Sequence, residues 1–532
     1  MASKPEAAGL SGTPPPADTA RSSSTPSPLT LGTEAVRLSD VCAVARGERR
    51  VVLAGDADYR ARLQAGRTAL ASRLENGGEV YGVTTGVGAS QGTHVEAHAR
   101  EEAAAHILRF HGVGTGRVLD PEEAAAVVVT RLASLARGYS AVRPEVLERL
   151  CALLNARVLP RIPEEGSVGA SGDLTPLSYV AALLVGEREA WVGDGIVDAA
   201  EAHQTQGLDP LALEPKESLA LMNGTSVMTA LAALSLERAR RLARFACALT
   251  AMSVRAIAGN PAHYAPEIFA LKPHPGSECA AAWIRADLAP ADAWKPMRLQ
   301  DVYSLRCAPH VIGVLLDALR FAEEWVEIEL NGVNDNPIVD PDGGGVFHGG
   351  NFYGGHIAFA MDGVKAAVAG IADLVDRQMQ LLCSPATNGG LPENLTAGAA
   401  GTHGFKALQI STSALAAEAL KLTMPAASFS RSTEAHNQDK VSMGTIAARD
   451  CRRVLELSET AAAMLLLANG QALELRGDAT GPGPAHQLRA TLRQWVAPVE
   501  EDRRQDLDIA TVLDHYRDGS LLAALEDADG AR

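Results

Sequence analysis

The chain has 532 residues, of which 47% are hydrophobic and 21% charged, a composition typical of a globular protein with a large core. Its 48 lysine and arginine residues are outnumbered by 64 acidic ones, and the formal net charge is −16. No stretch concentrates basic side chains as a nucleic-acid binder does, so nucleic acid is not expected as a partner.

The seven cysteines are scattered along the chain and form no C-x-x-C pair, which argues against a zinc ribbon and a disulfide framework. No apolar stretch approaches the roughly 20 residues needed to cross a bilayer. The amino terminus lacks the basic and apolar pattern of a secretory signal. We therefore expect reduced thiols, no membrane partner and a cytoplasmic location.

Residues 1–34 are rich in Pro, Ser, Thr, Ala and Gly. Such a composition buries too little apolar surface to offset the conformational entropy of the chain. The sequence therefore predicts a disordered tail over residues 1–34.

From Val41 onward the pattern becomes helical, and strand signals are few and short. Aliphatic residues recur at spacings of three and four over residues 143–159 and 177–185. Longer helical runs with few breakers cover residues 226–258, 311–330, 357–382, 402–424 and 445–475. Long helices that recur in this way indicate a bundle, and no repeat of fixed period suggests a solenoid. A further helical segment is expected over residues 509–525.

The turns between the long helices are polar, at residues 331–337, 348–355 and 434–439. An asparagine in any one of them is most simply a helix cap. Taken together, the three turns indicate a site assembled from helix ends.

The segment Gly166-Ser-Val-Gly-Ala-Ser-Gly-Asp-Leu-Thr-Pro-Leu177 admits three interpretations. A phosphate-binding loop is disfavoured, because neither G-x-G-x-x-G nor the Lys-Ser/Thr ending of a P-loop is present. An ordinary capped loop would use Ser171 or Asp173 ahead of a helix that begins near Pro176. The third interpretation is a backbone that modifies itself.

In that third case the Gly172 amide nitrogen attacks the Ala170 carbonyl carbon and two waters leave. The backbone closes to a five-membered imidazolone, and Ser171 becomes a dehydroalanine. Glycine leaves the attacking nitrogen unhindered and tolerates strained φ and ψ, while alanine keeps the carbonyl accessible. The product is an electrophilic methylene that none of the twenty side chains provides.

This segment resembles the signature of the aromatic amino-acid ammonia-lyase and aminomutase family, whose members form 4-methylidene-imidazol-5-one (MIO) from Ala-Ser-Gly. Further matching motifs follow in order between roughly Leu38 and Leu475: residues 81–86 (YGVTTG), 221–226 (LMNGTS), 303–309 (YSLRCAP), 334–337 (NDNP), 349–352 (GGNF), 437–439 (NQD) and 441–444 (VSMG).

The resemblance implies a mainly α fold in which a central bundle of long helices is shared among four subunits. A smaller mixed N-terminal domain, residues 35–225, would carry the MIO loop. The bundle would occupy residues 226–480 and a C-terminal helical segment residues 481–532. In such a homotetramer Tyr303 and Arg306 would come from a different chain than Ala170. MIO would be the cofactor, without metal or nucleotide.

The resemblance also implies residue roles. Tyr81 would be the base, although a phenol with a free pKa of about 10 needs nearby dipoles to stabilise its anion. Arg306 would bind the substrate carboxylate through its two-point fork, unless it forms a structural ion pair. Tyr303 would lie near the amine, Asn223 near the MIO oxygen and Asn351 near the carboxylate. Phe352, Glu434 and Gln438 also match site positions, although Glu434 could equally be an exposed carboxylate at a helix end.

The pair Phe110-His111 corresponds to the residues that select the ring in this family. Phe110 favours an apolar ring, while His111 could bind a phenolic hydroxyl or an imidazole nitrogen, or serve only structure. Histidine ammonia-lyases usually carry His and Glu where this chain has Tyr353 and Gln438. A further departure is His310, where the family commonly has Gln.

The departures at Tyr353 and Gln438 favour tyrosine or phenylalanine as the substrate, giving coumarate or cinnamate and ammonia. Three alternatives stay open: a histidine ammonia-lyase, an aromatic amino-acid 2,3-aminomutase, and a helical scaffold without catalytic activity.

Overall fold

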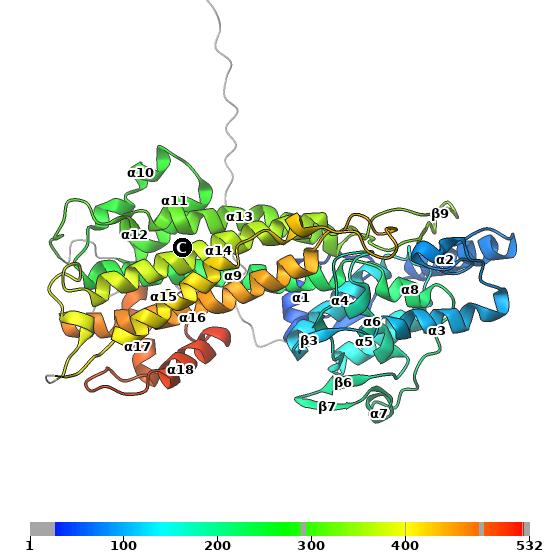
Figure 1. Cartoon of the computed structure of the whole chain (residues 1–532), viewed down its shortest axis with the longest axis horizontal. Coiled ribbons are helices and arrows are strands. Elements are labelled where there is room, and N and C mark those ends of the chain that lie inside the picture. Colours follow the sequence, from blue (N-terminus) through cyan, green and yellow to red (C-terminus); the bar gives the residue numbers. More distant parts are fainter. Residues whose placement is uncertain (1–26, 289–293, 399–400, 478–482, 524, 526–532) are drawn as a thin grey trace, which may run out of the picture.

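The structure is a computed structural model that describes residues 27–288, 294–398, 401–477, 483–523 and 525. Long helices run along the long axis of the molecule, and shorter helices with small sheets gather toward one end (Figure 1). The described chain is mainly helical, which confirms the mainly α part of the predicted fold.

The five predicted long helices are confirmed, each to within a few residues except α15, which is shorter at both ends. They are α9 (Ser226–Ala256), α13 (Ala308–Leu330), α14 (Gly355–Cys383), α15 (Lys406–Lys421) and α16 (Gly444–Arg476). Helices α9, α14 and α16 pack against one another and bury most of their apolar residues in one continuous core. Each of these three helices begins at the end of the bundle that faces the smaller helices and sheets (Figure 1).

Shorter helices cover the opposite end of the bundle and its side. Helices α10 (Pro266–Ala270), α11 (Pro275–Asp287) and α12 (Tyr303–Arg306) lie at the far end. Helices α17 (Pro484–Trp495) and α18 (Asp506–Arg517) pack against α16. The helix expected over residues 509–525 therefore begins earlier and stops at Arg517, two residues before Gly519, which has a φ of +83°.

The other end combines small sheets with eight helices: α1 (Leu38–Ala45), α2 (Ala57–Glu75), α3 (Arg100–Phe110), α4 (Pro121–Ala136), α5 (Pro144–Asn155), α6 (Leu174–Leu184), α7 (Ala199–Thr205) and α8 (Glu217–Met222). Strands β3 (Thr115–Val118) and β5 (Pro163–Glu165) pair antiparallel, as do β8 (Ile338–Val339) and β9 (Val346–Phe347). Strands β4 (Val158–Pro160), β6 (Glu189–Val192) and β7 (Gly195–Asp198) form an antiparallel sheet. Strands are few and short, as predicted.

The prediction of a disordered tail over residues 1–34 is wrong for its last part, and residues 1–26 lie outside the described residues. Strand β1 (Leu29–Leu31) pairs in parallel with β2 (Val51–Leu53), with Leu29 opposite Val51. Leu29 and Leu31 are buried in the core. Leu29 and Leu31, on the same face of the strand, thus bury enough apolar surface to offset the conformational entropy that this short segment loses on folding.

The helix expected over residues 143–159 is also shorter than predicted. Helix α5 ends at Asn155, and Arg157 has a φ of +56°, which a helix does not accommodate. The apolar residues that follow form strand β4 instead. Among the described residues, no helix is long and apolar enough to span a membrane.

Candidate active site

The Ala170-Ser171-Gly172 segment lies in a tight loop whose backbone needs glycine. Ser171 has a φ of +52° and Gly172 a φ of +75°. A Cβ on Gly172 would lie 2.0 Å from the Gly224 carbonyl oxygen, and one on Gly169 would lie 2.2 Å from Ser442 Oγ. The loop is therefore pressed between two turns, and only glycine fits at both contacts.

Backbone hydrogen bonds fix the loop on both sides. The Asp173 amide donates to the Gly224 carbonyl at 2.7 Å, and the Gly224 amide donates to the Ser171 carbonyl at 3.3 Å. On the other side the Met443 amide donates to the Val168 carbonyl at 3.0 Å. The loop thus joins the turn before α9 to the turn before α16.

The Asp173 carboxylate is fully buried and ties the same elements together. Its Oδ2 accepts the amides of Val227 at 3.0 Å and Met228 at 2.9 Å, both in the first turn of α9. Its Oδ1 accepts the hydroxyls of Ser167 at 3.1 Å and Thr445, the latter in the first turn of α16. Asp173 precedes α6 but makes no capping bond to it, so the capped-loop interpretation is wrong about its partner. Burial raises the pKa of Asp173 to about 6, although these hydrogen bonds oppose the change.

A second layer of buried charge supports the loop from behind. Arg131 donates to Asn334 Oδ1 at 2.9 Å and to the Ala220 carbonyl, and burial lowers its pKa to about 10. Lys216 and Asp335 form an ion pair with no exposed side-chain surface. These contacts hold the 331–337 turn against α4 and α8. This polar turn is therefore part of the frame, by which we mean the buried residues and turns that hold the Ala170-Ser171-Gly172 loop.

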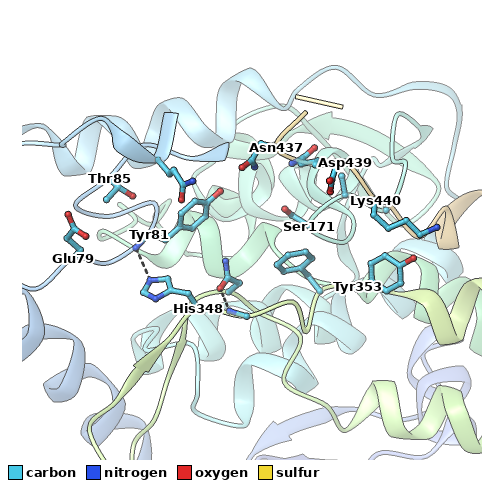
Figure 2. Close-up of a pocket in the computed structure, with 16 residues that line it drawn as sticks. Glu79, Tyr81, Thr85, Ser171, His348, Tyr353, Asn437, Asp439 and Lys440 are labelled. Atoms are coloured by element: carbon cyan, nitrogen blue, oxygen red, sulfur yellow. Dashed lines mark hydrogen bonds between the residues drawn. The ribbon is translucent and has the colours of Figure 1, made fainter. Parts of the chain in front are cut away.

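A cavity of about 610 Å³ opens beside the loop and includes Ala170 and Ser171 in its lining. The Tyr81 phenol and the Ser171 hydroxyl point toward one another across it (Figure 2). Tyr81 Oη accepts the Gly88 amide at 2.7 Å, and the Tyr81 amide donates to His348 Nε2 at 3.3 Å. Burial and the Glu434 carboxylate raise the pKa of Tyr81, while the Gly88 amide lowers it.

Five of the predicted site residues line this cavity: Tyr81, Ala170, Ser171, Phe352 and Gln438. Gly172, in the loop itself, and Asn223, beside the loop, are buried and do not line the cavity. Asn223 Nδ2 donates to the Asn336 carbonyl at 3.2 Å, while its Oδ1 is buried and has no hydrogen-bond partner within the described part of the chain. The exposed Asn351 donates to the Val333 carbonyl at 3.0 Å.

Phe110 and His111, the predicted ring-selecting pair, lie outside the lining of this cavity. Phe110 ends α3 and is 55% exposed. His111 Nδ1 is 2.8 Å from the Ile107 carbonyl oxygen, and burial lowers the pKa of His111. The backbone contact agrees with the structural interpretation of this histidine.

Tyr303 and Arg306 lie far from the cavity, at the other end of the bundle (Figure 1). The Ser304 carbonyl between them accepts Gln378 Nε2, which also donates to Thr250 Oγ1. Thr250 lies 22 residues beyond Met228 on α9, which corresponds to about 33 Å at 1.5 Å per residue. One chain therefore does not bring these residues to the loop. Tyr303 is 71% exposed, and the Arg306 guanidinium lies 4.6 Å from its ring centre.

Several lining residues were not assigned from the sequence. They are Glu79, Thr85, Gln91, Gly169, Asn336, His348, Gly349, Tyr353, Asn437, Asp439 and Lys440. Most of them belong to the polar turns or to the matching motifs. Those turns and motifs are therefore the sequence signal from which these residues could be predicted. Among the described residues, no group of three or more His, Cys, Asp or Glu side chains is arranged to hold a metal ion.

Comparisons with known proteins agree along nearly the whole chain. The family described as aromatic amino acid lyase matches residues 36–494. A histidine ammonia-lyase of Gloeobacter violaceus is 39% identical over 513 residues, covering 94% of this chain and 98% of that protein. A tyrosine ammonia-lyase of Cereibacter sphaeroides is 38% identical over 503 residues, covering 90% and 96%. The crystal structure of a tyrosine aminomutase from Streptomyces globisporus has a TM-score of 0.87 at 36% identity, covering 94% and 98%.

The buried Asp173 carboxylate should make stability depend on pH. Its folded-state pKa, about 6, lies above the unfolded value of about 3.9, so its protonated form favours the folded state and this contribution is lost as pH rises from 4 through 6. In Asp173→Asn the amide oxygen can accept the two α9 amides and the NH₂ can donate to the two hydroxyls. We expect Asp173→Asn to gain about 3 kcal/mol relative to the parent protein between pH 4 and pH 7. Denaturant unfolding at several pH values measures this.

Asp173→Ala is the matched control, because it leaves the same donors without an acceptor. It should be less stable than Asp173→Asn at every pH, by about 1–3 kcal/mol per unsatisfied buried group. A stability difference between the parent protein and Asp173→Asn that does not change with pH would contradict the assignment.

Proposed function

The chain belongs to the aromatic amino acid lyase family, and from this we propose that it is an MIO-dependent ammonia-lyase that converts tyrosine or phenylalanine to coumarate or cinnamate and ammonia. Its activity class, a carbon-nitrogen lyase with aminomutases among its structural neighbours, follows from the family. The MIO group and the substrate are the finer parts of the proposal.

The loop suits formation of MIO from Ala170, Ser171 and Gly172. A side chain at residue 172 would collide with the Gly224 carbonyl, so only glycine fits there. The amide nitrogen of Gly172, which must attack the Ala170 carbonyl carbon, therefore has no Cβ beside it. The buried Asn223 Oδ1, which has no partner within the described residues, is an acceptor available to a group formed there. When formed, MIO supplies an electrophilic carbon that turns the substrate amine into a leaving group.

The chain's own groups supply the remaining chemistry. Tyr81 faces Ser171 across the cavity, as a base that takes a proton from the β carbon must. The Gly88 amide at 2.7 Å favours the phenolate, while burial disfavours it. Helices α6, α9 and α16 all begin at this loop, and the positive ends of their dipoles favour negative charge there.

The observation that carries the substrate assignment is Gln438 in the cavity lining. Histidine ammonia-lyases usually have a glutamate at this position, and a neutral amide gives an imidazole ring no charged partner. Tyr353, which stands where those enzymes usually have histidine, lines the same cavity. Both residues favour a phenyl or phenol ring over imidazole.

Two observations keep histidine as the second candidate. Curated relatives at 37–40% identity are named histidine ammonia-lyases. The carboxylates of Glu79 and Asp439 also line the cavity and could pair with an imidazolium. An aminomutase would use the same residues and differ only in whether the amine returns before the product leaves.

We further propose that the active site is completed by another subunit of a homotetramer. Tyr303 and Arg306 lie about 33 Å along the bundle from the loop that they would serve. The outer faces of α13, α14 and α15 expose large apolar side chains, as expected of surfaces that another chain covers: Val314, Ile328, Phe359, Ile410 and Leu420. The domain bounds at 35–225, 226–480 and 481–532 and the cytoplasmic location stay predictions.

Formation of MIO should be visible in the mass of the purified protein. We expect the intact chain to be lighter than its sequence by the mass of two water molecules, because cyclisation and dehydration each remove one. Ser171→Ala lacks the hydroxyl that is lost, so it should show no dehydration and no turnover. Peptide mapping should place the loss at residues 170–172, and an unmodified tripeptide in active enzyme would contradict the mechanism.

A shared site predicts that two inactive chains restore each other. Ser171→Ala and Arg306→Ala should each be inactive alone, but after joint refolding about a quarter of the sites should combine an intact loop with an intact arginine. The matched control is Ser171→Ala with Tyr81→Phe, whose residues line one cavity in one chain and should not complement. Recovery of the same activity in both mixtures, or of no activity in either mixture, would contradict the proposed assembly.

The substrate is tested by offering tyrosine, phenylalanine and histidine and following coumarate, cinnamate and urocanate by absorbance. We expect kcat/KM for tyrosine or phenylalanine to exceed that for histidine by about tenfold or more. Gln438→Glu should narrow this ratio, because it restores a carboxylate near the ring. Chromatography for β-amino acids separates lyase from mutase, and a preference for histidine would favour the second candidate.

A further inference from the structure

We propose that Glu434 is a positioning residue whose carboxylate holds the Tyr81 loop, defined as residues 81–92, in its place over the cavity. Sequence resemblance had assigned Glu434 to substrate binding, but it is absent from the cavity lining. The inference rests on the proposed function only in taking Tyr81 as the base.

The central contact is a backbone amide shared between two carboxylate oxygens. The Ala89 amide lies 2.9 Å from both Oε1 and Oε2 of Glu434. The preceding amide, that of Gly88, donates to the Tyr81 phenolic oxygen at 2.7 Å. Because the two amides are adjacent, a displacement of Ala89 also moves the donor that holds the phenol. Glu434 thus acts on Tyr81 through one peptide unit.

The fit at this contact leaves no room for a side chain on the loop. Gly88 has a φ of +60°, and a Cβ there would lie 2.5 Å from the Glu434 carboxyl carbon. A larger residue at 88 would therefore push the carboxylate away. The contact can therefore be disturbed in two independent ways, by a substitution at Glu434 or by a side chain at residue 88.

The turn that carries Glu434 has an unusual backbone conformation. Glu434, Ala435 and His436 have φ values of +50°, +51° and +64°, a run of left-handed conformations that persists only when the surroundings hold it. Thr433 and Gln438 close the turn through backbone hydrogen bonds of 2.9 and 3.3 Å. Gln438 at one end lines the cavity, while Glu434 at the other end contacts the loop. A single turn therefore sets both the ring pocket and the base.

The charge of Glu434 also acts on Tyr81 directly. Burial is the main cause that raises the pKa of Tyr81, and Glu434 raises it further. The other charged or titratable side chains in the lining are Glu79, His348, Tyr353, Asp439 and Lys440, and His348 Nε2 accepts a hydrogen bond from the Tyr81 amide. Removing the Glu434 charge should therefore favour the phenolate while loosening the loop, two effects that different measurements can separate.

Hydrogen exchange of the full-length protein without substrate tests the contact. In Glu434→Ala the Ala89 amide loses its acceptor, so exchange in a peptide covering residues 84–93 should become about tenfold faster. Glu434→Gln retains one acceptor oxygen and should be intermediate, and Gly88→Ala should reproduce the effect from the loop side. The matched control is Glu79→Gln, a cavity carboxylate with no hydrogen bond to Ala89 among the described residues, which should leave exchange unchanged.

Kinetics separates positioning from substrate contact. If Glu434 positions the base, Glu434→Gln should lower kcat more than it raises KM, and the limb of the pH profile that reports Tyr81 ionisation should move to lower pH. Glu434→Asp, which keeps the charge on a shorter side chain, should leave that limb in place. Unchanged exchange in Glu434→Ala, or a rise in KM alone with the pH profile fixed, would overturn the inference.

The exchange experiment requires no turnover, so the two proposals fail separately. A parent protein without lyase activity or loss of two waters would refute the proposed function, whereas fast exchange in Glu434→Ala would still establish the contact. An active, matured parent protein whose loop exchanges equally in all variants would refute the role of Glu434 alone.

Discussion

The structure depends on one buried carboxylate at the meeting point of three helices. Asp173 follows the Ala-Ser-Gly loop, precedes α6, accepts the first amides of α9 and binds a hydroxyl in the first turn of α16. Burial alone would favour its neutral form, as the pKa of about 6 shows. Four hydrogen-bond donors offset that cost, and two of them are helix amides that would otherwise have no partner. The loop is thus held by the same groups that begin the bundle.

This arrangement explains why the residues predicted for the site lie at two ends of the bundle. The positive ends of α9, α14 and α16 gather at one end of the bundle, where the loop, Tyr81 and the polar turns meet. A rigid helix also separates whatever lies at its two ends, and α9 with its 31 residues spans about 45 Å. Arg306 cannot bridge such a span with a side chain. In the homotetramer that we propose, the carboxylate-binding arginine of each site therefore comes from another chain.

Sequence reasoning located most of the frame but few of its long-range contacts. The long helices were predictable because Ala and Leu recur at helical spacing without breakers, and the polar turns identified much of the cavity. The burial of Leu29 and Leu31 was missed, because composition averages over a tail whose last residues reach β2. Asp173 looked like a local cap, but its partners lie 54, 55 and 272 residues away. Glu434 was assigned by motif position, whereas its partner Ala89 lies 345 residues away.

The frame and the ring pocket also differ in how freely they can change. The loop is fixed by backbone pairing with Gly224, by Asp173 and by glycines that admit no Cβ, so a side chain at Gly169 or Gly172 disturbs the fold itself. Gln438, Tyr353 and Asp439 line the cavity and take no part in those contacts, although Gln438 also closes its own turn with Thr433. Replacing their side chains changes the charge offered to a bound molecule. This separation explains how relatives named for histidine and for tyrosine can share similar identity with the same chain. Under the proposed function, overall similarity reflects the shared reaction, and the lining residues set the substrate.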